Sequence, residues 1–241
     1  MNPLKLPKFI SGLKDISSLQ LTFRDRVGAA QVLGNVLKST IKKITKDKSE
    51  IIVLGIPRGG AIVADIVAEK LGADFDVIFP RKITSPDNKE NSIGAVMSDD
   101  TTYFDDFAVE SLKIPQEYIK KETDIQIEEI RMRKDLYRPN RSLEDYSLQG
   151  KVVILVDDGI ATGATVIVAA RWIKRQNPKH LIIAAPVSQP QTVYILKAEC
   201  DTLEIVSTPA NFGSVSQFYK TFEQELEDQV VSVLKRRGLI E

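Results

Sequence analysis

The chain has 241 residues, 43% of them hydrophobic, so it can bury a sizeable core, while two full domains would be cramped. Lys plus Arg equals Asp plus Glu at 33 each, which excludes an overall field favouring nucleic acid or a membrane surface. The single cysteine, Cys200, excludes an intramolecular disulfide. Because the sequence has no long uncharged apolar stretch and no signal-peptide core, we expect a cytoplasmic protein with neither membrane nor nucleic acid as a partner.

Apolar runs alternate with helical periodicity along the chain. The predicted elements, in chain order, are a helix at about residues 30–44, a strand at 51–56, a helix at 61–71, strands at 75–79 and 152–156, a helix at about 166–173, and strands at 181–185 and 203–206. This alternation predicts an α/β fold in which helices flank a doubly wound, mainly parallel sheet. We expect a single domain over residues 1–241, with ligands beyond the carboxyl ends of the strands.

The most specific motif follows the strand at 152–156. Two carboxylates, Asp157 and Asp158, precede a loop made of Gly159, Ile160, Ala161, Thr162, Gly163, Ala164 and Thr165. Loop amides, threonine hydroxyls and the positive end of the following helix can surround a phosphate dianion. The carboxylates would repel phosphate and suit neutral donors such as ribose hydroxyls, so the motif predicts a ribose 5-phosphate site. An ordinary strand-to-helix loop is the alternative, but it does not explain the adjacent carboxylates.

The stretch resembles the signature with which type I phosphoribosyltransferases hold 5-phosphoribosyl 1-pyrophosphate. With the further motifs P-R-G-G, R-K and I-G-A-V, nearly the whole chain resembles a little-characterised group of predicted phosphoribosyltransferases. The resemblance implies the type I phosphoribosyltransferase fold, a homodimer, and a small hood built from the terminal segments, including about residues 207–241. Relative to compact members of the family, residues 105–150 are an insertion.

This insertion is densely charged, with apolar residues at Ile119, Ile127 and Ile130, and Pro115 suits the first turn of a helix. The pattern predicts a mostly helical segment. It could cap the site, build a dimer interface or do neither.

A second motif, Arg58, Gly59 and Gly60, directly follows Pro57 and the strand at 51–56. Glycines let backbone amides approach an anion closely, and Arg58 adds a permanent charge with bidentate geometry. In the resembled family this position is the pyrophosphate loop, and we expect a non-proline cis peptide at Arg58-Gly59. The alternative is a plain turn with a solvated arginine.

A third motif places Arg81 and Lys82 after the strand at 75–79, ahead of a polar, turn-rich run at 83–92. The run resembles the mobile catalytic loop of the family, in which Lys89 would arrive when the loop closes and excludes water from the reaction. A surface hairpin, with residues 92–97 and 101–104 flanking a turn, is a compatible alternative.

A fourth segment, residues 208–222, resembles the part of 6-oxopurine phosphoribosyltransferases that crosses the nucleobase. The match implies that Phe212 stacks on the base and that backbone groups near Gly213 reach the ring edge. Core packing is a competing role for Phe212. Phe218, Tyr219 and Phe222 are spaced for a helix and are expected to pack inward.

Two departures bear on the acceptor. Ala161 stands where 6-oxopurine enzymes carry an aspartate, and no lysine follows the strand at 181–185. Hypoxanthine and guanine are therefore disfavoured, while adenine, a pyrimidine or an unfamiliar base remains open. Ser188 and Gln189 are the candidate partners of the ring edge.

The resemblance implies Mg²⁺-assisted transfer of the 5-phosphoribosyl group to a base nitrogen without a covalent nucleophile. Asp157 and Asp158 would hold the ribose hydroxyls and contact Mg²⁺ indirectly, through substrate or water. Arg58, Arg81 and Lys82, together with Mg²⁺, would bind the departing pyrophosphate. A regulatory protein that senses 5-phosphoribosyl 1-pyrophosphate on the same fold, without catalysis, is the alternative.

Overall fold

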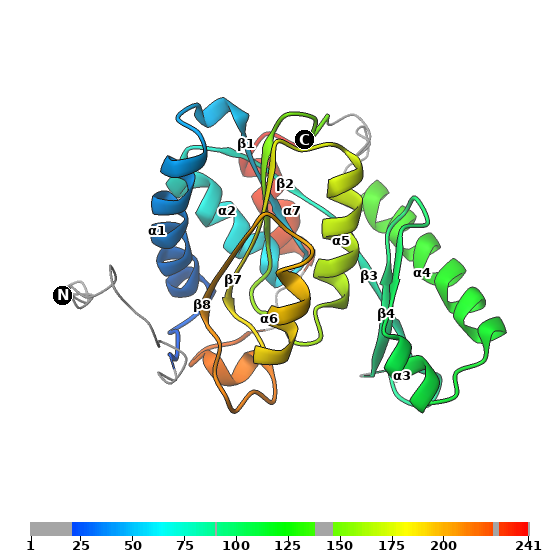
Figure 1. Cartoon of the computed structure of the whole chain (residues 1–241). Coiled ribbons are helices and arrows are strands. Elements are labelled where there is room, and N and C mark those ends of the chain that lie inside the picture. The colour runs from blue at the N-terminus through cyan, green and yellow to red at the C-terminus, as the bar shows by residue number, and fades with distance from the viewer. Residues whose placement is uncertain (1–20, 90, 138–146, 224–226, 241) are drawn as a thin grey trace.

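The computed structural model describes residues 21–89, 91–137, 147–223 and 227–240 (Figure 1). A five-stranded sheet with the order β2-β1-β6-β7-β8 lies at its centre, and every neighbouring pair in it is parallel. Its strands are β1 (Ile51–Gly55), β2 (Asp74–Val77), β6 (Val152–Val156), β7 (His180–Val187) and β8 (Thr202–Ser207). All five predicted strands are confirmed, with ends that differ by at most two residues.

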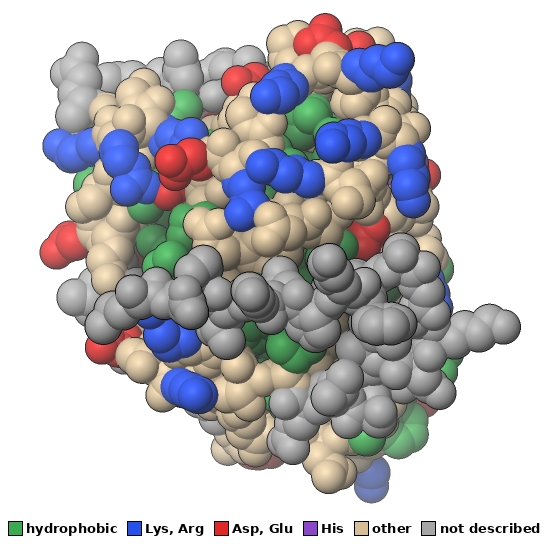
Figure 2. Space-filling model, turned by 90° about the vertical axis from the view of Figure 1, so that its left-hand side faces the viewer, with side chains coloured by type: hydrophobic (Ala, Val, Ile, Leu, Met, Phe, Trp, Pro, Cys, Tyr) green, Lys and Arg blue, Asp and Glu red, His purple; other side chains and the backbone are tan. Residues whose placement is uncertain are grey.

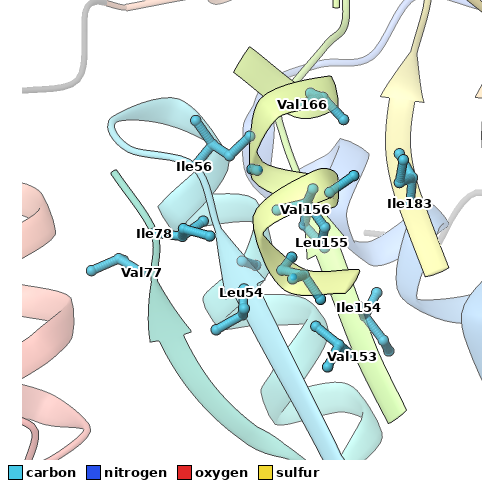
Figure 3. Packing of buried hydrophobic residues seen from close by; sticks show 14 of the residues in the cluster. Leu54, Ile56, Val77, Ile78, Val153, Ile154, Leu155, Val156, Val166 and Ile183 are labelled. Atoms are coloured by element: carbon cyan, nitrogen blue, oxygen red, sulfur yellow. The ribbon is translucent and has the colours of Figure 1, made fainter. Parts of the chain in front are cut away.

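Continuous apolar runs in the sequence form the inner strands of this sheet. Every residue of β1 and β6 is buried, because helices cover both faces and leave no side for polar residues. The edge strand β8 is only half-buried and carries Thr202 and Glu204. Figure 3 shows side chains of β1, β6 and β7 packed in one cluster with Val166 of the overlying helix.

Five helices surround the central sheet in the part of the chain that is described. They are α1 (Arg26–Ile44), α2 (Gly59–Leu71), α5 (Ala164–Arg175), α6 (Pro190–Leu196) and α7 (Glu227–Arg236). Helix α1 begins at Asp25, whose carboxylate accepts a hydrogen bond from the amide of Gly28. Helix α2 stops at Gly72, as predicted, in the left-handed conformation with φ of 66°.

The basic side chains on the face that carries α1 are dispersed. Lys38, Lys42 and Lys43 are exposed on α1, and Figure 2 shows separate Lys and Arg side chains over this face. This arrangement fits a solvated helix surface. No helix among the described residues is long and apolar enough to cross a membrane.

The strand order changes direction between β1 and β6, although these two strands are parallel. From β1 the chain crosses through α2 to β2 on one side, and from β6 it crosses through α5 to β7 on the other side. Right-handed crossovers in opposite directions place α2 and α5 on opposite faces of the sheet. The loops after β1 and β6 therefore diverge and leave a crevice at the carboxyl ends of these strands, where doubly wound folds bind ligands.

A second, antiparallel sheet stands beside α5 (Figure 1). Its strands are β3 (Arg81–Thr84), β4 (Ser92–Val96) and β5 (Thr102–Phe104), which confirms the predicted hairpin and adds β3 to it. The segment predicted as an insertion contains α3 (Asp106–Ser111) and α4 (Gln116–Tyr137), so its described part is largely helical. Pro115 directly precedes α4 rather than lying in its first turn, and residues 138–146 of the insertion lie outside the described residues.

The segment after β8 crosses the carboxyl end of the sheet. It contains the short helix η3 (Val215–Phe218), and Tyr219 forms an isolated bridge with Phe23, just before α1. Phe218 and Tyr219 are buried, as predicted, although the helical stretch ends at Phe218. Residues 1–20, the other expected part of the hood, lie outside the described residues.

Candidate functional site

A polar cleft of about 640 Å³ opens at the carboxyl ends of β1 and β6. It is lined by the turn after β1, the hairpin of β3 and β4, helix α4, the loop after β6, and the segment after β8. The predicted residues that line it are Arg58, Gly59, Arg81, Lys82, Lys89, Asp157, Asp158, Gly159, Ile160, Ala161, Thr162, Gly163 and Thr165. Gly60 and Ala164 lie next to it, buried in the first turns of α2 and α5.

Neighbouring segments fix the conformation of the loop after β6. The Ile160 amide donates to the Val187 carbonyl and the Ile160 carbonyl accepts from the Gln189 amide, each at 2.9 Å. The Thr192 hydroxyl donates to the Ala161 carbonyl at 2.5 Å. These bonds shape the loop without using side chains that line the cleft.

Helix α5 begins at this loop without a side-chain cap. Its N-cap is Gly163, with φ of 80°, and a Cβ atom there would lie 2.6 Å from a methyl carbon of Thr192. Glycine is therefore required by both conformation and space. Because Gly163 has no side chain to bond the first amides of α5, they remain suited to an anion in the cleft, with the hydroxyls of Thr162 and Thr165 nearby.

The two carboxylates after β6 occupy an environment that disfavours their charge. Burial, and then the negative charge of Asp158, raise the pKa of Asp157 well above its ordinary value. Burial also raises the pKa of Asp158, while the charge and hydrogen bond of Arg26 act in the opposite direction. The site therefore holds two adjacent acids with one strong internal cation.

That cation, Arg26, was missed by the sequence reasoning. Its Nε donates to Asp158 at 2.7 Å, and its side chain is only 8% exposed. The same guanidinium donates to the Glu223 carbonyl at 2.6 Å and lies 3.9 Å from the ring centre of Phe222. A signal existed, because Arg26 lies four residues before Ala30 and so extends the apolar stripe of α1, where a charge needs a buried partner.

The turn after β1 packs directly on the acidic pair. A Cβ atom at Gly59 would lie 1.9 Å from the Asp158 carboxylate, and one at Gly60 would lie 2.8 Å from that of Asp157. Glycine is therefore needed here for contact with the carboxylates, a reason that the sequence reasoning had not given. The non-proline cis peptide lies at Pro57-Arg58, so the predicted position at Arg58-Gly59 was wrong by one bond.

The lining of the cleft carries more positive than negative charge. Among the described residues that line the cleft, five carry positive charge (Arg58, Arg81, Lys82, Lys89 and Arg133), against three carboxylates (Glu122, Asp157 and Asp158). Arg81 is oriented by Gln126 of α4, whose side-chain oxygen accepts from its Nε at 3.0 Å. Three lining residues, Glu122, Gln126 and Arg133, come from the insertion and were not predicted.

The four predicted base contacts do not gather in this cleft. Phe212 packs on Phe218 with ring centres 5.2 Å apart and, with Gly213, borders a separate shallow depression. The Gly213 amide donates to the side chain of Gln217, Ser188 is fully buried, and Gln189 starts α6 behind the loop. The side chains that this part of the chain contributes to the cleft are those of Val215 and Phe222.

Residues 25–219 match the family described as the phosphoribosyl transferase domain. The match covers most of the sequence, so the chain belongs to the phosphoribosyltransferase family, a class of enzymes, and the resemblance carried by the motifs is confirmed.

The chain is similar to curated relatives and to a solved structure. Rv0571c of Mycobacterium tuberculosis strain H37Rv, named as a suspected phosphoribosyl transferase, is 32% identical over 186 residues, which are 77% of this chain and 42% of that protein. MT0597 of strain CDC 1551 gives the same values, so the chain spans about two fifths of the length of these curated relatives. The crystal structure of TT1426 from Thermus thermophilus has a TM-score of 0.70 and 32% identity, covering 90% of this chain and 99% of that one. The predicted fold class is thereby confirmed.

The environment of Asp157 generates a stability prediction. Because burial and Asp158 raise its pKa, charged Asp157 destabilises the folded state at neutral pH. Asp157→Asn should therefore raise the Tm at pH 7.5 by about 2–4 °C, the shift expected from about 1 kcal/mol in a protein of this size. Differential scanning calorimetry measures this shift.

The sign of the pH dependence can be checked in the same experiment. Below the raised folded-state pKa, wild-type Asp157 takes up a proton and its penalty begins to fall, so the advantage of the variant should shrink as the pH drops and vanish near the ordinary pKa of the unfolded chain. Asp158→Asn is the matched control and should lower the Tm, because it removes the carboxylate that forms the ion pair with the buried guanidinium of Arg26. A lower Tm for Asp157→Asn at pH 7.5 would contradict the electrostatic account.

Proposed function

We propose that this protein, acting as a homodimer, transfers the 5-phosphoribosyl group from 5-phosphoribosyl 1-pyrophosphate to a nucleobase nitrogen and releases pyrophosphate. The observation that carries the proposal is one cleft with three chemically different regions. It has an uncapped helix N-terminus, a pair of partly buried carboxylates and a group of five cations. These regions match the phosphate, the ribose hydroxyls and the diphosphate of that molecule.

Each region has a distinct role in this proposal. The loop from Gly159 to Thr165 binds the 5-phosphate through amides and hydroxyls, because it presents donors without a formal charge. Asp157 and Asp158 accept hydrogen bonds from the ribose hydroxyls. Arg58, Arg81, Lys82 and Lys89 face the diphosphate, where permanent positive charge gives the largest gain.

Magnesium fits this set of donors through the substrate. Within the described part of the chain, no three His, Cys, Asp or Glu side chains come together as a metal site. Mg²⁺ often keeps several waters and binds through one or two carboxylates plus substrate phosphates, so Asp157 and Asp158 would contact it indirectly. When bound, Mg²⁺ neutralises charge on the departing pyrophosphate.

The chain's own contribution to the chemistry is fixed charge on both sides of the breaking bond. The ribosyl group becomes cationic as pyrophosphate leaves, and the carboxylates of Asp157 and Asp158 lie on its side of the cleft. The cations lie on the side of the leaving group. Arg26 and Gly59 hold Asp158 in place, so little reorganisation is needed when charge develops.

The acidic pair gives the first functional prediction. Asp157→Asn should lower the rate of pyrophosphate release by about 10² or more, because it removes negative potential at the point where positive charge develops. The Tm of the same variant shows whether the loss has a structural origin. A variant that is folded and as active as the wild type would remove Asp157 from the mechanism.

The acceptor is expected to be an amino base. Ala161 lines the cleft where the 6-oxopurine enzymes carry an aspartate, and the oxo group of hypoxanthine or guanine would need a donor that the alanine side chain does not supply. An unpaired buried polar group costs about 1–3 kcal/mol, so adenine should exceed hypoxanthine and guanine by about tenfold to a hundredfold. Pyrophosphate release across a panel of purines and pyrimidines measures this preference.

The panel also discriminates between the two functional classes. Equal rates with hypoxanthine and adenine would show that Ala161 does not determine which base is preferred. If every base is silent while 5-phosphoribosyl 1-pyrophosphate still binds, the result favours a sensor on the same fold. Absence of both binding and turnover would overturn the proposal.

A further inference from the structure

The inserted helix α4 presents one polar face to the cleft. Glu122, Gln126, Glu129 and Arg133 follow each other at spacings of four, three and four residues, which places them on one side of the helix. Three of them line the cleft, and Glu129 lies 4.0 Å from the guanidinium of Arg81. Apolar residues on a neighbouring stripe, including Ile127 and Ile130, are buried and hold this face in position.

Arg133 is the cation of this face. Its side chain is 25% exposed, and its guanidinium lies 3.4 Å from the carboxylate of Glu227 at the start of α7. It also approaches another cation, because its charge contributes, after burial, to a lowered pKa of Arg81. The charges of Arg58, Arg133 and Glu227 all reach the hydroxyl of Tyr137, which places them in one neighbourhood.

Within the cleft lining, positive charges outnumber carboxylates, although Glu122, Glu129 and Glu227 also lie around Arg81. Guanidinium groups that approach one another repel, and such a group becomes favourable when a multiply charged anion lies between its members. A diphosphate meets this requirement and offers oxygens to the bidentate fork of each arginine. Glu227 lies in the first turn of α7, where the helix dipole stabilises a carboxylate that is no longer paired.

We propose that Arg133 is a diphosphate-binding residue supplied by the insertion, and that Glu227 holds its guanidinium at the cleft until the diphosphate arrives. The inference rests on the proposed function, since it names a further contact in the same site. It gives α4 a role as a wall of the binding site. The ligand class is a sugar or nucleotide derivative that carries a diphosphate.

The test measures the affinity of the full-length protein for inorganic pyrophosphate with Mg²⁺ and, separately, for ribose 5-phosphate, by calorimetric titration. Arg133→Gln should weaken pyrophosphate binding by about tenfold to a hundredfold, the effect expected from losing a charge-assisted hydrogen bond. Ribose 5-phosphate should bind as in the wild type, because its site lies on the loop after β6.

Arg131→Gln is the matched control on the same helix. Arg131 is 60% exposed, pairs with Glu128 and is not among the lining residues, so its loss should change neither affinity. Glu227→Gln tests the counter-charge independently of any folding defect in Arg133→Gln. It should tighten pyrophosphate binding about twofold to fivefold, because Arg133 no longer has to leave a carboxylate.

The outcomes separate this inference from the proposed function. Wild-type protein that binds neither probe would overturn both. Wild-type protein that binds both probes, with Arg133→Gln equal to Arg131→Gln in pyrophosphate affinity, would overturn only the role of Arg133. Weaker pyrophosphate binding by Glu227→Gln would contradict the holding role of Glu227.

Discussion

The burial of Asp158 against Arg26 is the contact on which the rest of the site depends. Their side chains, 2.7 Å apart, are only 13% and 8% exposed, so removing either partner would take away a strong, poorly solvated ion pair. The pair joins the loop after β6 to the first turn of α1, and Arg26 also binds the Glu223 carbonyl and covers Phe222. One ion pair therefore connects the acidic loop, the first helix and the segment that crosses the cleft.

Neighbouring structure is shaped around this contact. The turn after β1 can approach only because Gly59 and Gly60 lack side chains, and Gly159 accommodates Val215 in the same way, since a Cβ there would lie 2.3 Å from a valine methyl carbon. The Tyr219 hydroxyl donates to the Asp158 carbonyl at 2.5 Å, which fixes the backbone behind the carboxylate. The result is a pair of carboxylates held by fixed contacts in a cleft whose other charged groups are mostly cations. That arrangement suits a reaction in which positive and negative charge separate.

Periodicity in the sequence was sufficient to predict the sheet and its main helices, because strands buried on both faces read as unbroken apolar runs. The loop after β6 could be predicted as a binding site from its motif, since its amides, hydroxyls and carboxylates come from consecutive residues. Contacts between residues that lie far apart in the chain could not be predicted from the sequence. Arg26 and Asp158 are 132 residues apart, Arg133 meets the cleft only through the packing of α4, and the cis bond depends on a backbone angle that no side chain reveals. Phe212 was assigned to the nucleobase by matching residues 208–222 to a segment of the 6-oxopurine enzymes. In the structure it is Val215, in η3, that lines the cleft.

The most direct test of the central claim is a crystal structure of the protein soaked with 5-phosphoribosyl 1-pyrophosphate and Mg²⁺. The account predicts that the 5-phosphate lies on the loop from Gly159 to Thr165 and the ribose hydroxyls on Asp157 and Asp158. The diphosphate should lie among Arg58, Arg81 and Lys82. Electron density that places the ligand outside this cleft, or a phosphate against the carboxylates with the sugar reversed, would contradict the account.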